Sequence, residues 1–93
     1  MNYKIIYTKS YIRRAGKFIK KYPKLLGQYE KTLKLLELNP FHPSLKLHGL
    51  SGKLNGLFAV SINLSFRIVL ELLISGKEII PIDVGIHDDV YKN

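Results

Sequence analysis

The C-terminal half of the chain contains three runs in which every second residue is apolar: "LFAVSIN" (57–63), "FRIVLELLI" (66–74) and "EIIPIDVGIH" (78–87). A period of two is typical of strands with one buried face. Short turn-like segments separate the runs, at 63–65 and around Ser75–Gly76. The pattern predicts three consecutive antiparallel strands joined by hairpins.

The apolar positions of the three runs are all even-numbered, and this constrains the hairpins. They are Phe58, Val60 and Ile62; Phe66, Ile68, Leu70 and Leu72; and Ile80, Ile82, Val84 and Ile86. Paired residues of antiparallel strands lie on one face, so both loops must contain an odd number of residues if these side chains share one core. We therefore predict three-residue loops at 63–65 and 75–77. Pro81 has no N–H and indicates a sheet edge or a bulge there.

The N-terminal half has a helical period after a short predicted strand at 3–7. Its first apolar stripe consists of Tyr11, Ile12, Ala15, Phe18, Ile19 and Tyr22, with Thr8 as the expected N-cap. Pro23 suits the first turn of a second helix, which should extend to about Leu38. The sequence thus predicts a single α+β domain over residues 1–93: a strand, an α-helical hairpin, and three antiparallel strands. Together these form a mostly antiparallel four-stranded sheet packed on the helices.

Composition excludes several classes of site. Cysteine is absent, which excludes disulfides, thiolate metal sites and a cysteine nucleophile. Charges interrupt every apolar run near the N-terminus, so we expect no signal peptide, no membrane span and a cytoplasmic location. Residues 1–53 carry twelve Lys and Arg against two acids, whereas residues 54–93 carry three against five. The basic half suits a polyanion such as nucleic acid, the alternative being a solvated surface.

The predicted register places a polar set of side chains on the face away from the core. Ser61, Arg67 and Gly85 should lie opposite one another on adjacent strands, with His87 beside Ser65 at one end. This face is too polar to be a second core, so it is a solvated surface or a site. Arg67 lies between apolar neighbours in the middle of its strand. Alternatively, Arg67 forms a surface ion pair with Glu71 or Asp83, which would contribute under about 1 kcal/mol to the stability of the fold.

Three stretches, "LKLHGLSGKLNGLF", "FRIVLEL" and "IDVGIHDDVY", in this order of elements, resemble the RelE/ParE toxin superfamily of type II toxin–antitoxin systems. The resemblance is strongest to the YafQ-like and RelE/StbE branch, whose members end on similar "DIGTHDEVY" strings. It covers essentially the whole chain. It implies a RelE-like fold and a toxin that cleaves mRNA, usually on the ribosome, and that a co-expressed antitoxin protein neutralises.

The resemblance implies a catalytic set of His48, Arg67, His87 and Tyr91. His48 matches a histidine of the YafQ branch, Arg67 the strand arginine, His87 the C-terminal catalytic histidine and Tyr91 the terminal aromatic residue. We expect the RNA backbone to contact basic side chains of the first helix and the central loop, namely Lys17, Lys20, Lys21, Lys46 and Lys53. The chain departs from the branch at Asp83, where relatives have a basic residue, and at Ser61 and Ser65, where they carry a histidine and an aspartate.

RNA cleavage by acid–base chemistry needs a base for the 2′-OH, a cation for the charge on phosphorus and an acid for the 5′-oxygen. We expect His87 to be the main proton carrier, His48 the second, and Arg67 the cation, with Tyr91 stacking on a base. No cofactor or metal is expected, because His48, His87, Asp88 and Asp89 have no diagnostic metal-ligand spacing. His42, between two prolines, is interpreted as structural.

Two other functions remain open at this level. A ParE-like toxin on the same fold would poison gyrase without RNA chemistry, although the ending "GIHDDVY" argues against it. A catalytically decayed relative would bind RNA through the basic face alone, and the departures at Asp83, Ser61 and Ser65 keep this alternative open.

Overall fold

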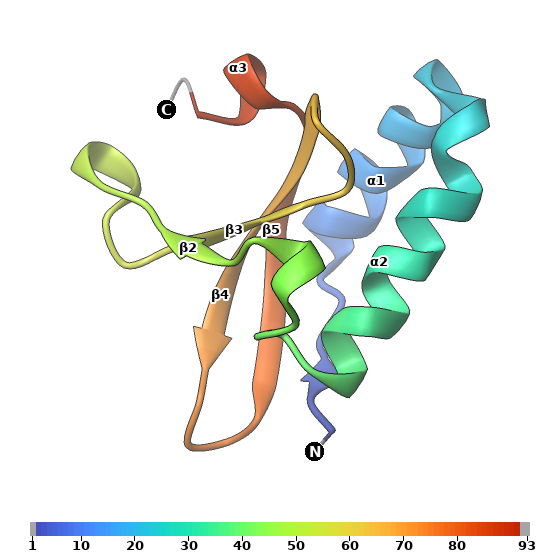
Figure 1. The fold of residues 1–93 in the computed structure, drawn as a ribbon. Helices are drawn as coiled ribbons and strands as arrows, with labels where there is room; N and C mark the ends of the chain where they lie inside the picture. Colours follow the sequence, from blue (N-terminus) through green and yellow to red (C-terminus); the bar gives the residue numbers. More distant parts are fainter. Residues whose placement is uncertain (1, 92–93) are drawn as a thin grey trace.

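Two helices cover one face of a five-stranded β-sheet in the computed structural model, which describes residues 2–91 (Figure 1). The elements follow the chain as β1 (Lys4–Ile5), α1 (Lys9–Lys21), the 3₁₀ turn η1 (Pro23–Leu25), α2 (Leu26–Leu38), η2 (Pro43–Leu45), β2 (His48–Gly49), η3 (Gly52–Leu54), β3 (Phe58–Ser61), β4 (Phe66–Leu73), β5 (Glu78–Ile86) and α3 (His87–Val90). The order of strands in the sheet is β1-β5-β4-β3-β2.

The helical hairpin begins and ends as its sequence predicts. Thr8 caps α1, because its hydroxyl accepts a hydrogen bond from the backbone N–H of Tyr11 at 3.1 Å. Pro23 opens the 3₁₀ turn that leads into α2. The apolar faces of both helices pack on the sheet, where Tyr11, Phe18, Tyr29 and Leu36 are buried. The α+β class and the helical hairpin are therefore confirmed.

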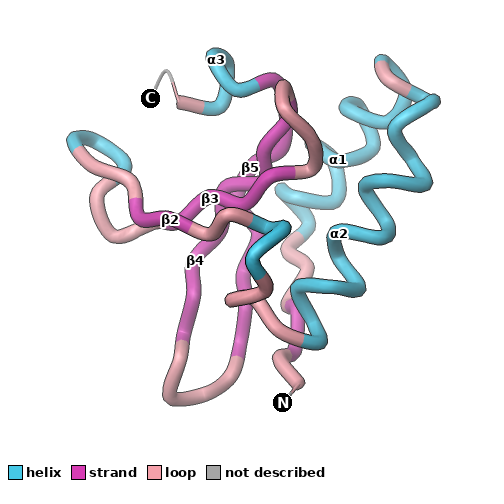
Figure 2. The backbone as a smooth tube through the Cα atoms, in the orientation of Figure 1, coloured by secondary structure: helices cyan, strands magenta, loops and turns pink. Residues whose placement is uncertain are grey.

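The sheet has one strand more than predicted. Strand β2 is two residues long and pairs antiparallel with β3, inside the Gly-punctuated segment 44–56 that contains Lys46 and Lys53 and that the sequence predicts to be the central loop. Figure 2 shows it as a short strand between loop segments. β1 pairs with β5 in parallel, and the other pairs are antiparallel. The prediction of four strands was wrong because a two-residue strand leaves no period that a sequence pattern can reveal.

The first hairpin has the predicted loop and the second does not. Ile62 and Phe66 flank the loop 63–65, and the Ile62 N–H donates to the Phe66 carbonyl at 2.9 Å. In the second hairpin the Lys77 N–H donates to the Ile74 carbonyl at 3.2 Å, so the loop is only two residues long. A loop with an even number of residues would place the even-numbered side chains of β5 on the opposite face of the sheet from the even-numbered side chains of β4.

A β-bulge restores the predicted faces in the second half of β5. Near the turn Leu70 pairs with Pro81, whereas further along Val69 pairs with Asp83, so Ile82 is the extra residue of β5. Beyond the bulge Arg67 pairs with Gly85, as predicted.

The bulge corrects the predicted core. Ile79 and Pro81 are fully buried near the turn, whereas Ile82 is 39% exposed and Ile80 only partly buried. Ile86, which the pattern also assigns to the core, is 36% exposed at the end of β5. The assignments of Ile80 and Ile82 were wrong because apolar residues on both parities of β5 conceal the change of register. Ile86 keeps the predicted pairing, with Phe66, and is exposed because it is the last residue of the strand.

The other face of the sheet also buries a few apolar side chains. Ala59 and Val69 are buried on the face away from the helical hairpin, and Val90 of α3 is 3% exposed. α3 directly follows β5 at the end of the sheet and packs on β4 and β5 (Figure 1). It directs the last described residues back across the sheet.

Candidate active site

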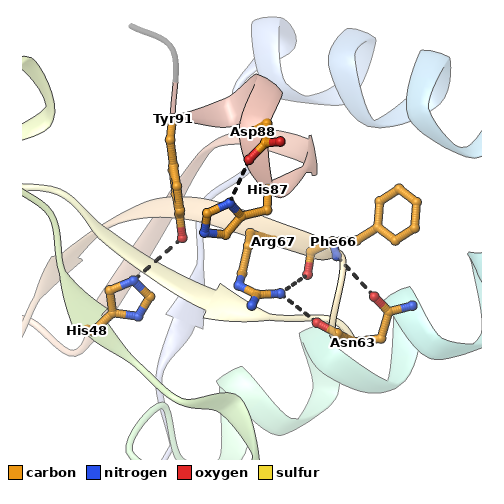
Figure 3. A network of polar contacts seen from close by, with 7 residues as sticks. All are labelled: His48, Asn63, Phe66, Arg67, His87, Asp88 and Tyr91. Carbon is orange, nitrogen blue, oxygen red and sulfur yellow. Dashed lines mark hydrogen bonds and ion pairs between the residues drawn. The ribbon is translucent and has the colours of Figure 1, made fainter.

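Four predicted site residues come together at one end of the open face of the sheet. His48 lies in β2, Arg67 in β4, His87 at the start of α3 and Tyr91 directly after α3. Figure 3 shows their side chains turned toward a common space above β3 and β4. The residues come from three separate segments, so only the fold brings them together.

The four-residue helix α3 places His87 and Tyr91 on the same side. Residues four apart are neighbours on a helix surface, and the two rings lie 4.4 Å apart between centroids at an interplanar angle of 73°. The backbone N–H of His87 donates to the Ser65 carbonyl at 2.7 Å, which ties the start of α3 to the first hairpin. The sequence predicts His87 beside Ser65, and the structure places it there, although at the first residue of a helix rather than the last of a strand.

His48 faces the same tyrosine from the opposite side. Its Nδ1–H donates to the carbonyl of Lys46 at 3.0 Å, and Lys46 has the left-handed backbone conformation (φ 53°) that turns this carbonyl toward the ring. A protonated Nδ1 leaves Nε2 as the acceptor in the neutral imidazole. Nε2 lies 3.5 Å from the Tyr91 hydroxyl, a long contact across the site (Figure 3).

Arg67 is held by the hairpin loop rather than by an acid. Its Nη1 donates to the carbonyl of Asn63 at 2.6 Å and to the carbonyl of Phe66 at 3.1 Å. Among the described side chains no carboxylate lies within ion-pair distance of the guanidinium. The alternative in which Arg67 pairs with Glu71 or Asp83 is therefore wrong. A guanidinium has five N–H donors, so Arg67 still has N–H groups that can bind an anion after donating to these two carbonyls.

The surroundings of Tyr91 keep its phenol protonated. Burial raises the pKa of Tyr91 above its ordinary value, and the nearby charge and hydrogen bonding of Arg67 oppose part of this rise. The hydroxyl is consequently neutral near pH 7 and acts as a hydrogen-bond donor or acceptor rather than as an anion.

Two acidic residues near the site contribute little charge to it. The Asp88 carboxylate lies 3.2 Å from His87 Nδ1, but it is 90% exposed, so its interaction is strongly screened. Asp83 turns to α1, where it pairs with Arg14 at 3.4 Å, and its other oxygen accepts from the Val84 N–H at 2.9 Å. The Asp83 carboxylate is therefore directed away from the four predicted site residues. The side chain of Asp89 lies outside the description.

The predicted RNA-binding lysines fall into two regions. Lys46 and Lys53 belong to the segment around β2, and the Lys46 carbonyl contacts His48 directly. Lys17, Lys20 and Lys21 are exposed on α1. Lys17 and Lys21 line a groove of about 260 Å³ between α1 and β5, with Val90 at its side. None of His48, Arg67, His87 and Tyr91 lines this groove.

The loop residue Asn63 is a contributor that sequence reasoning missed. Its side-chain oxygen accepts from the backbone N–H groups of Ser65 and Phe66, at 2.8 and 3.0 Å. Asn at the first position of a three-residue hairpin loop is a recognisable turn signal, but its link to Arg67 appears only in three dimensions.

A metal site and a membrane-spanning helix are both absent from the described part of the chain. Among the described side chains, which leave out that of Asp89, no group of three or more His, Asp or Glu is arranged to hold a metal ion. No helix in this part of the chain is long and apolar enough to cross a membrane.

Comparison with solved structures identifies the fold. No protein-family model and no curated protein matches the chain in sequence. The structure of YafQ from E. coli strain BL21(DE3) superposes with a TM-score of 0.77 at 16% identity, over 96% of this chain and 98% of that one. The toxin–antitoxin complex RelBE2 from Mycobacterium tuberculosis gives 0.73 at 16% identity, over 94% and 100%. The YoeB/ParE toxin from Agrobacterium tumefaciens gives 0.71 at 19% identity, over 90% and 98%. The predicted resemblance is confirmed at the level of structure: the chain has the fold of the RelE/ParE toxin superfamily.

Proposed function

We propose that this protein is the toxin of a type II toxin–antitoxin system and acts as an endoribonuclease that cleaves mRNA, in the ribosomal A site, and thereby inhibits translation. The observation that carries the proposal is the convergence of His48, Arg67, His87 and Tyr91 at one end of the open sheet face (Figure 3). The basic balance of residues 1–53 supports a polyanionic substrate.

The geometry supports a division of labour among the four side chains. With Nδ1 donating to Lys46, His48 offers an unprotonated Nε2 that can accept the proton of the 2′-OH. Arg67 stabilises the charge on the phosphate, since its guanidinium matches two oxygens at once. His87 in its protonated form gives a proton to the leaving 5′-oxygen. The products are a 2′,3′-cyclic phosphate and a 5′-OH, and side chains of the protein supply all the required groups without a metal ion.

Tyr91 has a supporting role in this proposal. Its ring packs edge-on against both imidazoles, with centroids 4.4 Å from His87 and 6.5 Å from His48. It sets the spacing of the two proton carriers and offers a face to a nucleobase, because aromatic rings commonly hold single-stranded RNA by stacking.

The proposed partner is a cognate antitoxin protein, and the proposed location is the cytoplasm, where mRNA and ribosomes are found. One solved structure of the same fold is a toxin–antitoxin complex. We expect the antitoxin to present acidic residues in a segment that folds on binding, because the toxin surface is basic.

The test measures growth and mRNA integrity in a host without the antitoxin, with purified protein on programmed ribosomes as the second assay. His87→Gln and Arg67→Ala should each restore growth and lower cleavage at least about a hundredfold, the usual scale for a positioned proton carrier or charge. The matched controls are His42→Gln, since among the described residues the His42 ring bonds to Ser44 within its own loop, and Arg13→Ala, at an exposed position of α1.

Each outcome decides between the proposed functions. Cleavage lost in the two site variants and kept in the controls supports the ribonuclease. Undiminished growth arrest and cleavage in both site variants would refute the assignment. Growth arrest with intact mRNA and damaged DNA would favour a gyrase-directed toxin. Ribosome or RNA binding without cleavage would favour a catalytically decayed relative.

A further inference from the structure

The hairpin loop 63–65 contacts two of the proposed active-site residues at once. Arg67 Nη1 donates a hydrogen bond to the backbone carbonyl of Asn63 at 2.6 Å and another to the carbonyl of the next residue after the loop, Phe66, at 3.1 Å. On the other side of the loop, the Ser65 carbonyl accepts the backbone N–H of His87 at 2.7 Å. The carbonyl directions of this loop therefore set where the guanidinium and the start of α3 lie (Figure 3).

The side chain of Asn63 bonds to the backbone of the same loop. Its Oδ1 accepts from the N–H groups of Ser65 at 2.8 Å and Phe66 at 3.0 Å, which is an Asx turn of the kind Asn forms readily. The loop closes with the Ile62 N–H donating to the Phe66 carbonyl at 2.9 Å. Removing Oδ1 leaves two N–H groups without their partner and frees the loop to rearrange.

We propose that Asn63 is a positioning residue of the active site, acting through the Arg67 guanidinium. It does not touch the reacting atoms. By holding the loop, Asn63 keeps the carbonyls of Asn63 and Phe66 in place as acceptors for Nη1. The remaining N–H donors of the guanidinium then face the phosphate. The inference rests on the proposed ribonuclease function, and it adds a residue that neither the sequence motifs nor the predicted catalytic set contains.

The variants are Asn63→Ala, which removes the acceptor, and Asn63→Ser, which retains a weaker one in the same turn. Asn39→Ala is the matched control, because Asn39 Oδ1 accepts from the Phe41 N–H at 3.0 Å in an equivalent turn elsewhere. Urea unfolding identifies any variant that fails to fold. If Asn63→Ala does not fold, Asn63→Ser carries the test, with a smaller loss expected.

In cleavage kinetics on programmed ribosomes, Asn63→Ala should lower kcat by about tenfold to a hundredfold, because small displacements of a positioned group cost rates of that order. KM should stay within about twofold, since substrate contacts remain. Asn63→Ser should recover part of the loss, and Asn39→Ala should remain close to the unmodified protein. In an Arg67→Ala background the loss caused by Asn63→Ala should shrink, because the group through which it acts is gone.

A second readout does not depend on activity. In ¹⁵N-labelled protein the two carbonyls should slow rotation of the Arg67 guanidinium and hold its side-chain N–H signals apart, and Asn63→Ala should average them. Unchanged Arg67 signals in Asn63→Ala would overturn the proposal. So would an unchanged kcat, an equal loss in Asn39→Ala, or a loss that adds fully to that of Arg67→Ala. If the unmodified protein does not cleave RNA, the proposed function fails, and the NMR result alone decides whether Asn63 holds the arginine.

Discussion

Gly85 offers the sharpest test of how α3 is held on the sheet. It pairs with Arg67 at the same end of the open face as the candidate site, and a Cβ added there would lie 3.2 Å from Val90 Cγ1. Ordinary contacts of this kind are a few tenths of an ångström longer, so either β5 or α3 must move in Gly85→Ala. We expect α3 to move, because β5 is hydrogen-bonded along β4 whereas a helix of four residues has little stability of its own.

The size of the effect follows from packing energies. Inserting a methyl group into a packed contact costs about 1–3 kcal/mol. The cost to global stability has an upper limit, because α3 can detach once the strain exceeds its docking energy, to which burial of Val90 contributes roughly 1.5–3 kcal/mol. At about 1.4 kcal/mol per factor of ten, the docking equilibrium of α3 should fall roughly fivefold to 150-fold. His87 and Tyr91 move with α3, so RNA cleavage should fall while the fold remains.

A double-mutant cycle with Val90→Ala isolates this contact. Val90→Ala removes Cγ1, so Gly85→Ala should cost little further stability or cleavage in that background. Gly27→Ala in α2 is the matched control: a Cβ there meets nothing within 4 Å, and replacing a helical glycine should raise stability by up to about 1 kcal/mol. Urea unfolding and cleavage on programmed ribosomes measure all four corners of the cycle. Full cleavage and stability in Gly85→Ala, or effects that add to within about 0.5 kcal/mol, would refute this account.

Three further predictions use the surrounding residues. Asp83→Asn should change cleavage less than about threefold and the free energy of unfolding by under about 1 kcal/mol, because Asp83 pairs with Arg14 at the surface and not with the site; a loss near that of Arg67→Ala would contradict this. Burial raises the pKa of Tyr11 far above its ordinary value of 10.0, so the unfolded chain loses this proton first and stability falls as pH rises above about 10. Tyr11→Phe should flatten that fall in urea titrations from about pH 9.5 to 11.5, and an unchanged slope would count against it. Tyr91→Phe keeps the ring and should retain more cleavage than Tyr91→Ala, whereas equal losses would assign the role to the hydroxyl.

Sequence reasoning succeeds here wherever a periodic pattern meets a physical constraint. Period two in the C-terminal half predicts three antiparallel strands, and the odd loop at 63–65 correctly sets Ser61 opposite Arg67. Helical spacing, the Thr8 cap and Pro23 predict the hairpin of helices. These features are local, so each can be derived from neighbouring residues alone.

The same reasoning fails where two local choices compensate or where an element is too short to show a period. A two-residue loop and the bulge at Ile82 each change the parity of β5, and together they leave Gly85 opposite Arg67 while exchanging which residues near the turn are buried. Strand β2 and helix α3 hold His48, His87 and the neighbouring Tyr91, yet with two and four residues they carry no periodic signal.

The sequence by itself determined the class of fold and the basic half, and its resemblance to a toxin superfamily predicted which side chains form the proposed catalytic set. Only the tertiary structure decided how those side chains are held. The partners of Arg67 are backbone carbonyls, the partner of Asp83 is Arg14, and the Nδ1–H of His48 is held by the Lys46 carbonyl. Carbonyl groups are present at every residue and leave no trace in composition or spacing, so their directions become known only when the chain is folded.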